Sequence, residues 1–359
     1  MLGNIRYLTV QTTSKNRSPF GISARRSRRF SLCLLGLLVV VCLTSGGASF
    51  AASPEVTPND RGAQAEISAL LQRADELRRG GEAVEAEVVF HRALTLAERA
   101  LGKDHPTVAV VLNGLEQILS GLGKIDEAAE ASERSLRIAE GVLGADNPDI
   151  APYLNNLAAL RHAQKREAEA EALLRRSIAM TEAALGSKDA RLAVALNNLG
   201  GYFHERGEFN SAEPLLARAL AINEGALGPD DPETAASLNK LARTLRSSGR
   251  VAEAAPLYAR ALEIAEGHLG VRHPYIASSL HNLGKVMAEL DRDGDAERMF
   301  QRSIAIREKA LGVDHPRVAT VLESYAGVLR RAGRLGEADE LIKRARQIKR
   351  KNAAPPARK

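Results

Sequence analysis

The stretch LGKDHPTVAVVLNGL at residues 101–115 decides the fold, because the chain repeats it at a fixed distance. It returns as LGADNPDIAPYLNNL at residues 143–157, and its opening returns as LGVDHPRVA at residues 311–319. The Leu-Gly pair that starts it recurs at intervals of 42 residues, at Leu101, Leu143, Leu185, Leu227, Leu269 and Leu311. A constant period of this size predicts stacked supersecondary units that share one core, and not a single globular fold.

Each repeat has the pattern of two helices joined by a short polar turn. In residues 149–185 apolar residues recur at three or four positions, first at Ile150, Leu154, Leu157 and Leu160, then at Ala170, Leu173, Leu174 and Ile178. This spacing places each set on one face of a helix. The proline of the repeated loop suits a first helical position, where no N–H is needed, and the residues before it include the good N-caps Asn147, Asp189 and Asp231. The loop glycine is expected to end the preceding helix in the left-handed conformation.

Two columns of alanine predict how closely the helices pack. One column holds Ala109, Ala151, Ala193, Ala235, Ala277 and Ala319, and the other holds Ala86, Ala128, Ala170, Ala212, Ala254, Ala296 and Ala338. Small residues at a contact let helix axes approach to about 8–10 Å. The second column predicts seven hairpins, with atypical units at both ends where the stack meets water.

These motifs resemble tetratricopeptide repeats of the kinesin-light-chain type. The resemblance rests on the Leu-Gly loop, on LNNLA at 154–158 and LNNLG at 196–200, and on RALAINE at 218–224, and it covers residues 65–350. It implies an all-α, right-handed superhelical solenoid of about seven helix-turn-helix repeats. It also implies a scaffold without enzymatic activity, which binds a partner protein or extended peptide in a concave groove lined by the first helix of each repeat.

The resemblance places the two positions after the first leucine of LNNL in this groove. They hold the asparagines Asn113, Asn155, Asn156, Asn197, Asn198, Asn239 and Asn282. Asparagine is a poor residue inside a helix, but its amide can both donate to and accept from a peptide backbone. A ladder of such amides could therefore hold an extended segment without reading its side chains. The alternative is that the amides hydrogen-bond neighbouring helices or are inherited with the repeat.

A basic cluster occurs on the first helices of two adjacent units. It comprises Lys240, Arg243, Arg246 and Lys285, and His281 occupies one of the asparagine positions beside it. Lys240 and Arg243 are three residues apart and therefore share one side of their helix. Positive charge focused in a concave surface favours an acidic segment or a C-terminal carboxylate as the partner. The alternative is a solvated charged rim.

Two further columns, on the second helix of each unit, are too regular to form a unique site. They are Arg92, Arg134, Arg176, Arg218, Arg260, Arg302 and Arg344, and Glu98, Glu140, Glu182, Glu224, Glu266 and Glu308. We expect both columns to serve structural roles between units. His105, His273 and His315 recur only because the loop recurs, so we expect them at helix starts and not at a metal site.

Residues 1–51 have the features of a secretory signal peptide. The basic run at 25–29 precedes the apolar run at 31–43, and small residues surround a cleavage site near Ala51. The apolar run is shorter than the about 20 residues that span a membrane. These features favour a bacterial, exported and periplasmic protein. The alternative is an uncleaved leader that holds the chain at the inner membrane as an accessory subunit of an envelope enzyme or export complex.

Composition argues against several functional classes. The leader holds seven of the 50 basic residues and no acidic one, so the net charge of +6 does not describe the repeats, and nucleic acid is not an expected partner. Both cysteines, Cys33 and Cys42, also lie in the leader, so the remainder offers no disulfide or thiolate zinc site. No phosphate loop or nucleophile motif appears, so neither cofactor nor metal is expected. An enzyme whose site leaves no motif is the remaining alternative.

The segments that flank the repeats have a different composition. Residues 52–64 are rich in Pro, Ser, Thr, Asn and Gly and are expected to be a linker. Residues 351–359 are expected to be a disordered basic tail. The basic residues from Lys343 onward could bind anionic lipid, or more simply stabilise the C-terminal end of the last helix.

Overall fold

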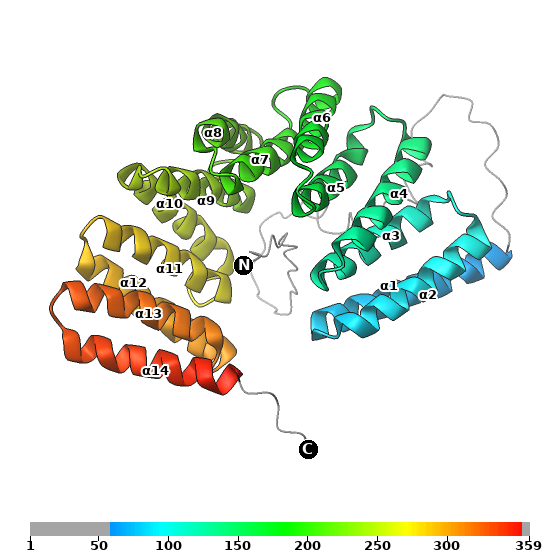
Figure 1. Ribbon diagram of the computed structural model, residues 1–359. Coiled ribbons are helices and arrows are strands. Elements are labelled where there is room, and N and C mark those ends of the chain that lie inside the picture. The colour runs from blue at the N-terminus through cyan, green and yellow to red at the C-terminus, as the bar shows by residue number, and fades with distance from the viewer. Residues whose placement is uncertain (1–57, 354–359) are drawn as a thin grey trace, which may run out of the picture. The chain divides into compact units, whose positions relative to one another are not determined.

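The structure is a computed structural model that describes residues 58–353. Within this range the chain forms fourteen α-helices and no strand, arranged as seven successive hairpins (Figure 1). The hairpins are α1 (Pro58–Gly80) with α2 (Ala83–Leu101), α3 (Pro106–Gly121) with α4 (Ile125–Leu143), α5 (Ala151–Ala163) with α6 (Glu167–Leu185), α7 (Ala190–Glu205) with α8 (Phe209–Ala226), α9 (Pro232–Ser247) with α10 (Val251–Leu269), α11 (Pro274–Glu289) with α12 (Asp293–Leu311), and α13 (Pro316–Arg331) with α14 (Leu335–Ala353). A short 3-10 turn, η2 (Pro148–Ile150), precedes α5. The predicted all-α solenoid of seven hairpins is confirmed.

The element boundaries differ from the prediction at both ends of the solenoid. Helix α1 begins at Pro58, so residues 58–64 of the predicted linker are helical, and α14 continues into the first residues of the predicted tail. The expected signal peptide at 1–51, with Cys33 and Cys42, lies outside the described residues. Across residues 58–353, no helix combines the length and the apolar character needed to cross a membrane.

Local sequence signals start the helices as predicted. Helices α3, α9, α11 and α13 begin at a proline, and Asn147, Asp189 and Asp231 each accept a hydrogen bond from the backbone N–H two residues ahead, at 2.8 Å. The repeated histidines do the same through Nδ1, at 3.1 Å for His105 and His315 and 3.2 Å for His273. These histidines therefore serve as helix caps.

The loop glycines adopt a conformation that differs from the prediction. Gly102 has φ 95° and ψ 154°, and Gly186 has φ 83° and ψ 172°. The positive φ is as expected, but the extended ψ places them outside the left-handed helical region. This part of φ/ψ space is essentially restricted to glycine, because a Cβ would clash there. It lets the chain leave each helix in an extended path toward the next N-cap.

Buried alanines let the helices pack closely, and contacts between helices join one hairpin to the next. All seven alanines of the column that includes Ala86 and Ala212 are fully buried. The second helix of each hairpin contacts the first helix of the following one, from α2 with α3 to α12 with α13. Contacts also join α5 with α7, α7 with α9 and α11 with α13. Figure 1 accordingly shows α5, α7, α9 and α11 on the inner side of an arc, with α6, α8, α10 and α12 outside.

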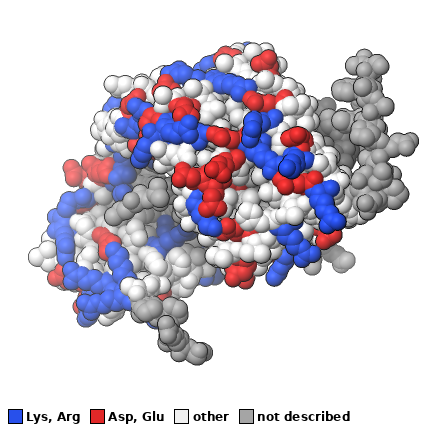
Figure 2. All heavy atoms as spheres, turned by 45° about the vertical axis from the view of Figure 1, so that its right-hand side comes forward, with Lys and Arg blue, Asp and Glu red and all other residues white. Residues whose placement is uncertain are grey.

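A ladder of arginine–glutamate pairs links the outer helices. From Arg134 onward each arginine of the column pairs with the glutamate 36 residues before it, as in Arg176–Glu140 at 2.6 Å and Arg260–Glu224 at 2.5 Å, whereas Arg92 pairs with Glu66. Most of these guanidinium groups also donate to the backbone carbonyl 31 residues earlier, for example Arg260 to Pro229 at 3.0 Å. The predicted structural role is confirmed, and acidic and basic residues accordingly alternate over much of the surface in Figure 2.

We predict that Ala212→Leu lowers the free energy of unfolding by about 1–3 kcal/mol, because the fully buried alanine on α8 has no room for three more carbons. Ala217 is exposed on the same helix, so Ala217→Leu is the matched control and should have little effect. Urea denaturation measures both variants. Equal midpoints for the two leucine variants would contradict the role of the alanine column.

Candidate functional site

The candidate binding residues lie on the odd-numbered helices α3, α5, α7, α9 and α11, and we call the surface of these helices that the candidates form the inner face. Each of these helices carries two consecutive candidate positions in its middle. Because the helices follow one another along the arc, the candidates form two rows across adjacent repeats. The rows differ in burial and in charge, so we describe their members separately.

Most of the asparagines remain at least partly accessible. Asn113, Asn156, Asn198 and Asn239 are half-buried and Asn282 is exposed. The Asn156 amide nitrogen donates to Asn113 Oδ1 at 2.8 Å, which joins α5 to α3. The Asn198 amide nitrogen is buried and has no hydrogen-bond partner. Asn239 lies within hydrogen-bonding reach of the Tyr275 hydroxyl on α11.

Two members of the expected ladder do not lie on the open surface. Asn155 is 7% exposed and Asn197 is 6% exposed. Asn197 donates to Ser237 Oγ on α9 at 2.8 Å, and the amide oxygens of both asparagines are buried without a partner. Asn197 therefore lies in the contact between neighbouring inner helices, as the alternative interpretation of the asparagines predicts. The accessible amides are therefore fewer than expected.

The four predicted basic residues come together on α9 and α11. Arg246 forms a two-pronged ion pair with Glu289, which includes an Nε–Oε2 bond of 2.8 Å. Among the described residues no such pair is found for Lys240, Arg243 or Lys285, and Lys240 Nζ contacts only the Asn197 carbonyl, at 3.5 Å. Burial, and then the charge of Arg243, lowers the pKa of Lys240 to about 8. Burial and the nearby Arg246 lower the pKa of Lys285 as well.

Two histidines lie beside this cluster. His281 shares a hydrogen bond of 2.9 Å with Ser324 on α13, and His204 shares one of 3.0 Å with Thr244 on α9. Burial first, and then neighbouring cations, lowers the pKa of each to about 4. Both imidazoles are therefore neutral at physiological pH. The sequence argument identified His281 but not His204, although His204 lies about two helical turns beyond the asparagine columns on α7.

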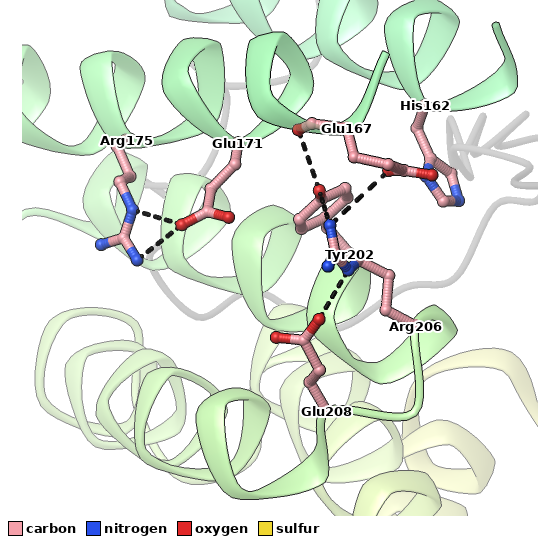
Figure 3. Close-up of polar contacts among 7 residues, drawn as sticks. All are labelled: His162, Glu167, Glu171, Arg175, Tyr202, Arg206 and Glu208. Atoms are coloured by element: carbon pink, nitrogen blue, oxygen red, sulfur yellow. Dashed lines mark hydrogen bonds and ion pairs between the residues drawn. The ribbon is translucent and has the colours of Figure 1, made fainter. Parts of the chain in front are cut away.

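A polar network stabilises the junction between the third and fourth repeats, at the turn end of the inner helices (Figure 3). His162 Nδ1 lies 2.8 Å from Glu167, and the Tyr202 hydroxyl donates to the Glu167 carbonyl at 3.0 Å. Arg206 donates to the same hydroxyl at 2.7 Å and pairs with Glu208 at 2.6 Å. Partial burial raises the pKa of Glu167, but the hydrogen bond from His162 and the charge of Arg206 outweigh it. The network joins the end of α5 and the start of α6 to the end of α7.

Glu116 is the candidate that sequence reasoning missed. It lies one turn after Asn113 on α3, is 6% exposed, and accepts a hydrogen bond from Asn156 Nδ2 at 3.1 Å. Burial raises its pKa to about 7, and only the Asn156 bond opposes this shift. The signal was present in the sequence, because the same position in the following repeats holds Ala158, Gly200, Ala242, Gly284 and Ala326.

No other feature of the described residues suggests a competing site. Residues 58–353 contain no group of three or more His, Cys, Asp or Glu side chains arranged to hold a metal ion. Two surface hollows occur outside the asparagine rows. One lies between Arg330 on α13 and Arg350 on α14, and the other lies at the turn between α7 and α8.

We predict that Glu116→Gln makes the protein more stable at alkaline pH. The folded-state pKa of about 7 exceeds the ordinary value of 4.5, so the native state binds the proton more tightly. Stability is therefore lost as the pH rises from 4.5 through 7, and the loss levels off above 7 at about 3 kcal/mol.

Urea denaturation should find Glu116→Gln close to wild type at pH 4.5 and more stable at pH 8. The same substitution at Glu323, whose carboxylate pairs with Lys349 at 2.6 Å, is the control and should show no alkaline gain. If the stability of the wild type and of Glu116→Gln changes with pH in parallel, Glu116 is not a buried carboxyl group without a cationic partner.

Comparison with known proteins agrees with the fold. The tetratricopeptide repeat model matches residues 66–141, 117–183, 191–267, 241–309 and 275–351. A search of curated sequences found no match. Among solved structures, BtubC (BKLC) from P. vanneervenii has a TM-score of 0.59 and 22% identity, over 66% of this chain and 95% of that one.

Two Rap structures share the fold at lower identity. RapI in its apo form has a TM-score of 0.56 and 13% identity, over 80% of this chain and 98% of that one. The Rap conjugation gene regulator of plasmid pLS20, in complex with the Phr* peptide, has a TM-score of 0.54 and 15% identity, over 87% of this chain and 83% of that one. Proteins built from this repeat are typically non-enzymatic scaffolds for protein interactions. The resemblance predicted from the sequence is confirmed, and the chain belongs to the tetratricopeptide repeat family.

Proposed function

We propose that this scaffold binds an extended segment of a partner protein along its inner face, and that the segment places acidic groups on α9 and α11. The observation that carries the proposal is the set of half-buried or exposed cations Lys240, Arg243 and Lys285, none of which forms an ion pair or hydrogen bond with a carboxylate within residues 58–353. Glu233 and Glu289 act on Lys240 and Lys285 only through longer-range charge interactions. The outer ladder differs, because there each arginine from Arg134 onward has its own glutamate.

Electrostatics favours an anionic guest over an empty surface. Burial lowers the pKa of Lys240 and of Lys285, and repulsion from Arg243 and Arg246, respectively, lowers it further. A carboxylate that enters relieves both costs, and the low local dielectric strengthens each charge-assisted hydrogen bond. The accessible amides of Asn239 and Asn282 lie on the same two helices and can hold the backbone of the guest. The Phr* peptide of the Rap regulator is a precedent for peptide binding by this fold.

A cell-envelope location is the second part of the proposal. We infer that the basic and apolar runs in residues 1–51 export the chain and that cleavage near Ala51 releases it into the periplasm. The alternative, a retained leader, makes the same solenoid a membrane-tethered subunit of an envelope complex.

The triple reversal Lys240→Glu, Arg243→Glu and Lys285→Glu should abolish acidic-peptide binding without unfolding the protein. The probe is a fluorescein-labelled 14-residue peptide of Asn, Ser and Thr with two Asp residues at one end, and fluorescence anisotropy measures binding. The control reverses Arg99, Arg137 and Lys309, three exposed cations on the outer helices, so the net charge changes equally. The proposal fails if both triple variants bind like the wild type, or if replacing the probe's Asp residues by Asn leaves wild-type binding unchanged.

Fractionation of cells that produce the full chain should recover a soluble periplasmic protein. N-terminal sequencing of this material is expected to begin near Ala52, because the signal peptide has been removed. Recovery of the intact chain in the membrane fraction would contradict release and support the tethered subunit.

A further inference from the structure

The second repeat contains an acidic residue where the following repeats contain only small ones. The position of Glu116 corresponds to Ala158, Gly200, Ala242, Gly284 and Ala326. In the other repeats this position packs against a large side chain of the hairpin's second helix: a Cβ on Gly200 would lie 2.7 Å from Leu216, and one on Gly284 would lie 2.8 Å from Phe300. An acidic side chain therefore could not fit there.

The second repeat has room for the Glu116 side chain because its second helix carries a smaller residue at the facing position. Ser132 on α4 occupies the position that corresponds to Leu216 and Phe300, and it is 4% exposed. The small serine leaves volume that the Glu116 stem can fill. Paired changes of this kind keep the hairpin packed while they introduce a carboxyl group beneath the inner face.

The carboxyl group of Glu116 lacks a cationic partner. Its Oε2 accepts one hydrogen bond from Asn156, and the other hydrogen of the same amide goes to Asn113. No lysine, arginine or histidine among the described residues forms an ion pair or hydrogen bond with Glu116, and no charged neighbour affects its pKa. Removing one partner of a buried ion pair is costly because the other charge is left uncompensated. A cationic ligand would remove this cost.

We propose that Glu116, together with Asn113 and Asn156, binds a primary ammonium group of the guest segment. This inference rests on the proposed function, since it adds a cationic contact to a guest whose acidic groups bind α9 and α11. The ammonium group displaces the proton that the carboxyl holds below neutral pH, so one proton enters solvent for each protonated Glu116 that is engaged. The carboxylate and the amide oxygen of Asn113 then accept hydrogen bonds from the ammonium group.

The two contacts define the spacing of charges along the guest. Helices α3 and α9 belong to the second and fifth repeats, and inner helices spaced about 10 Å apart separate them by about 30 Å. An extended chain covers this distance in about nine residues. The guest therefore carries its amine about nine residues from its acidic groups.

The test uses the Asp-bearing probe of the previous section with one Lys placed four, nine or twelve residues from the Asp pair, in both chain orders and with an acetylated N-terminus. A separate arm carries a free N-terminal amine in place of the Lys. The nine-residue spacing should bind the full-length protein about tenfold more tightly than the same peptide with Gln in place of Lys. Glu116→Gln should lose this preference and keep the Asp-dependent binding, whereas Glu323→Gln should retain both.

Calorimetry at pH 6.5 in two buffers of different ionisation enthalpy supplies an independent measurement. Binding of the Lys peptide should release most of a proton from the wild type and none from Glu116→Gln. The ammonium site is overturned if the Lys and Gln peptides bind with equal affinity in every arm, or if the two proteins release equal numbers of protons. In either case, binding that still depends on the Asp residues leaves the proposed function intact. Loss of all Asp-dependent binding overturns both.

Discussion

The stacking of each hairpin on the next is the constraint on which the rest of the structure depends. A hairpin alone leaves one face of each helix without a partner, and the neighbouring hairpin covers that face. The outer ladder follows the same period, because an arginine pairs with a glutamate 36 residues before it and, in most repeats, also with a carbonyl 31 residues before it. A one-residue insertion within a helix would shift the residues that make these contacts with the neighbouring repeats. The constant 42-residue spacing reflects this requirement.

This requirement divides the residues of a repeat into two classes. Alanine, arginine and glutamate columns hold the repeats together and therefore hardly vary along the chain. The middle of each inner helix contributes fewer of these contacts between repeats. Its residue type varies along the chain, for example at Asn113, Lys240 and His281. Variation along the inner face within a constant scaffold is the pattern expected where partner recognition occurs, since different positions along a bound segment require different contacts.

Sequence alone predicted the features that depend on a few neighbouring residues. Prolines, N-caps and apolar spacing act within one turn of helix, so hairpin number and most helix starts were correct. The burial of Asn155 and Asn197 was not predictable in this way, because it depends on how closely successive inner helices approach. The ψ angle of Gly102 also differed, since the path of the next helix determines it. Glu116 stood out in its column, but only the structure shows that it has no counter-ion.

The second repeat shows why packing and recognition must be separated before a variable position is assigned a function. Gly114 stands where three later repeats have asparagine, which suggests a gap in the row of amides. A Cβ there would lie 2.3 Å from the Phe90 ring, so the preceding repeat requires glycine at this position regardless of any guest. Glu116 has no such explanation, because alanine fits beside large partners in three other repeats and a buried acid without a counter-ion costs stability. A costly residue that packing does not demand is the stronger indication of function, and this reasoning distinguishes Glu116 from Gly114 although both depart from the repeat.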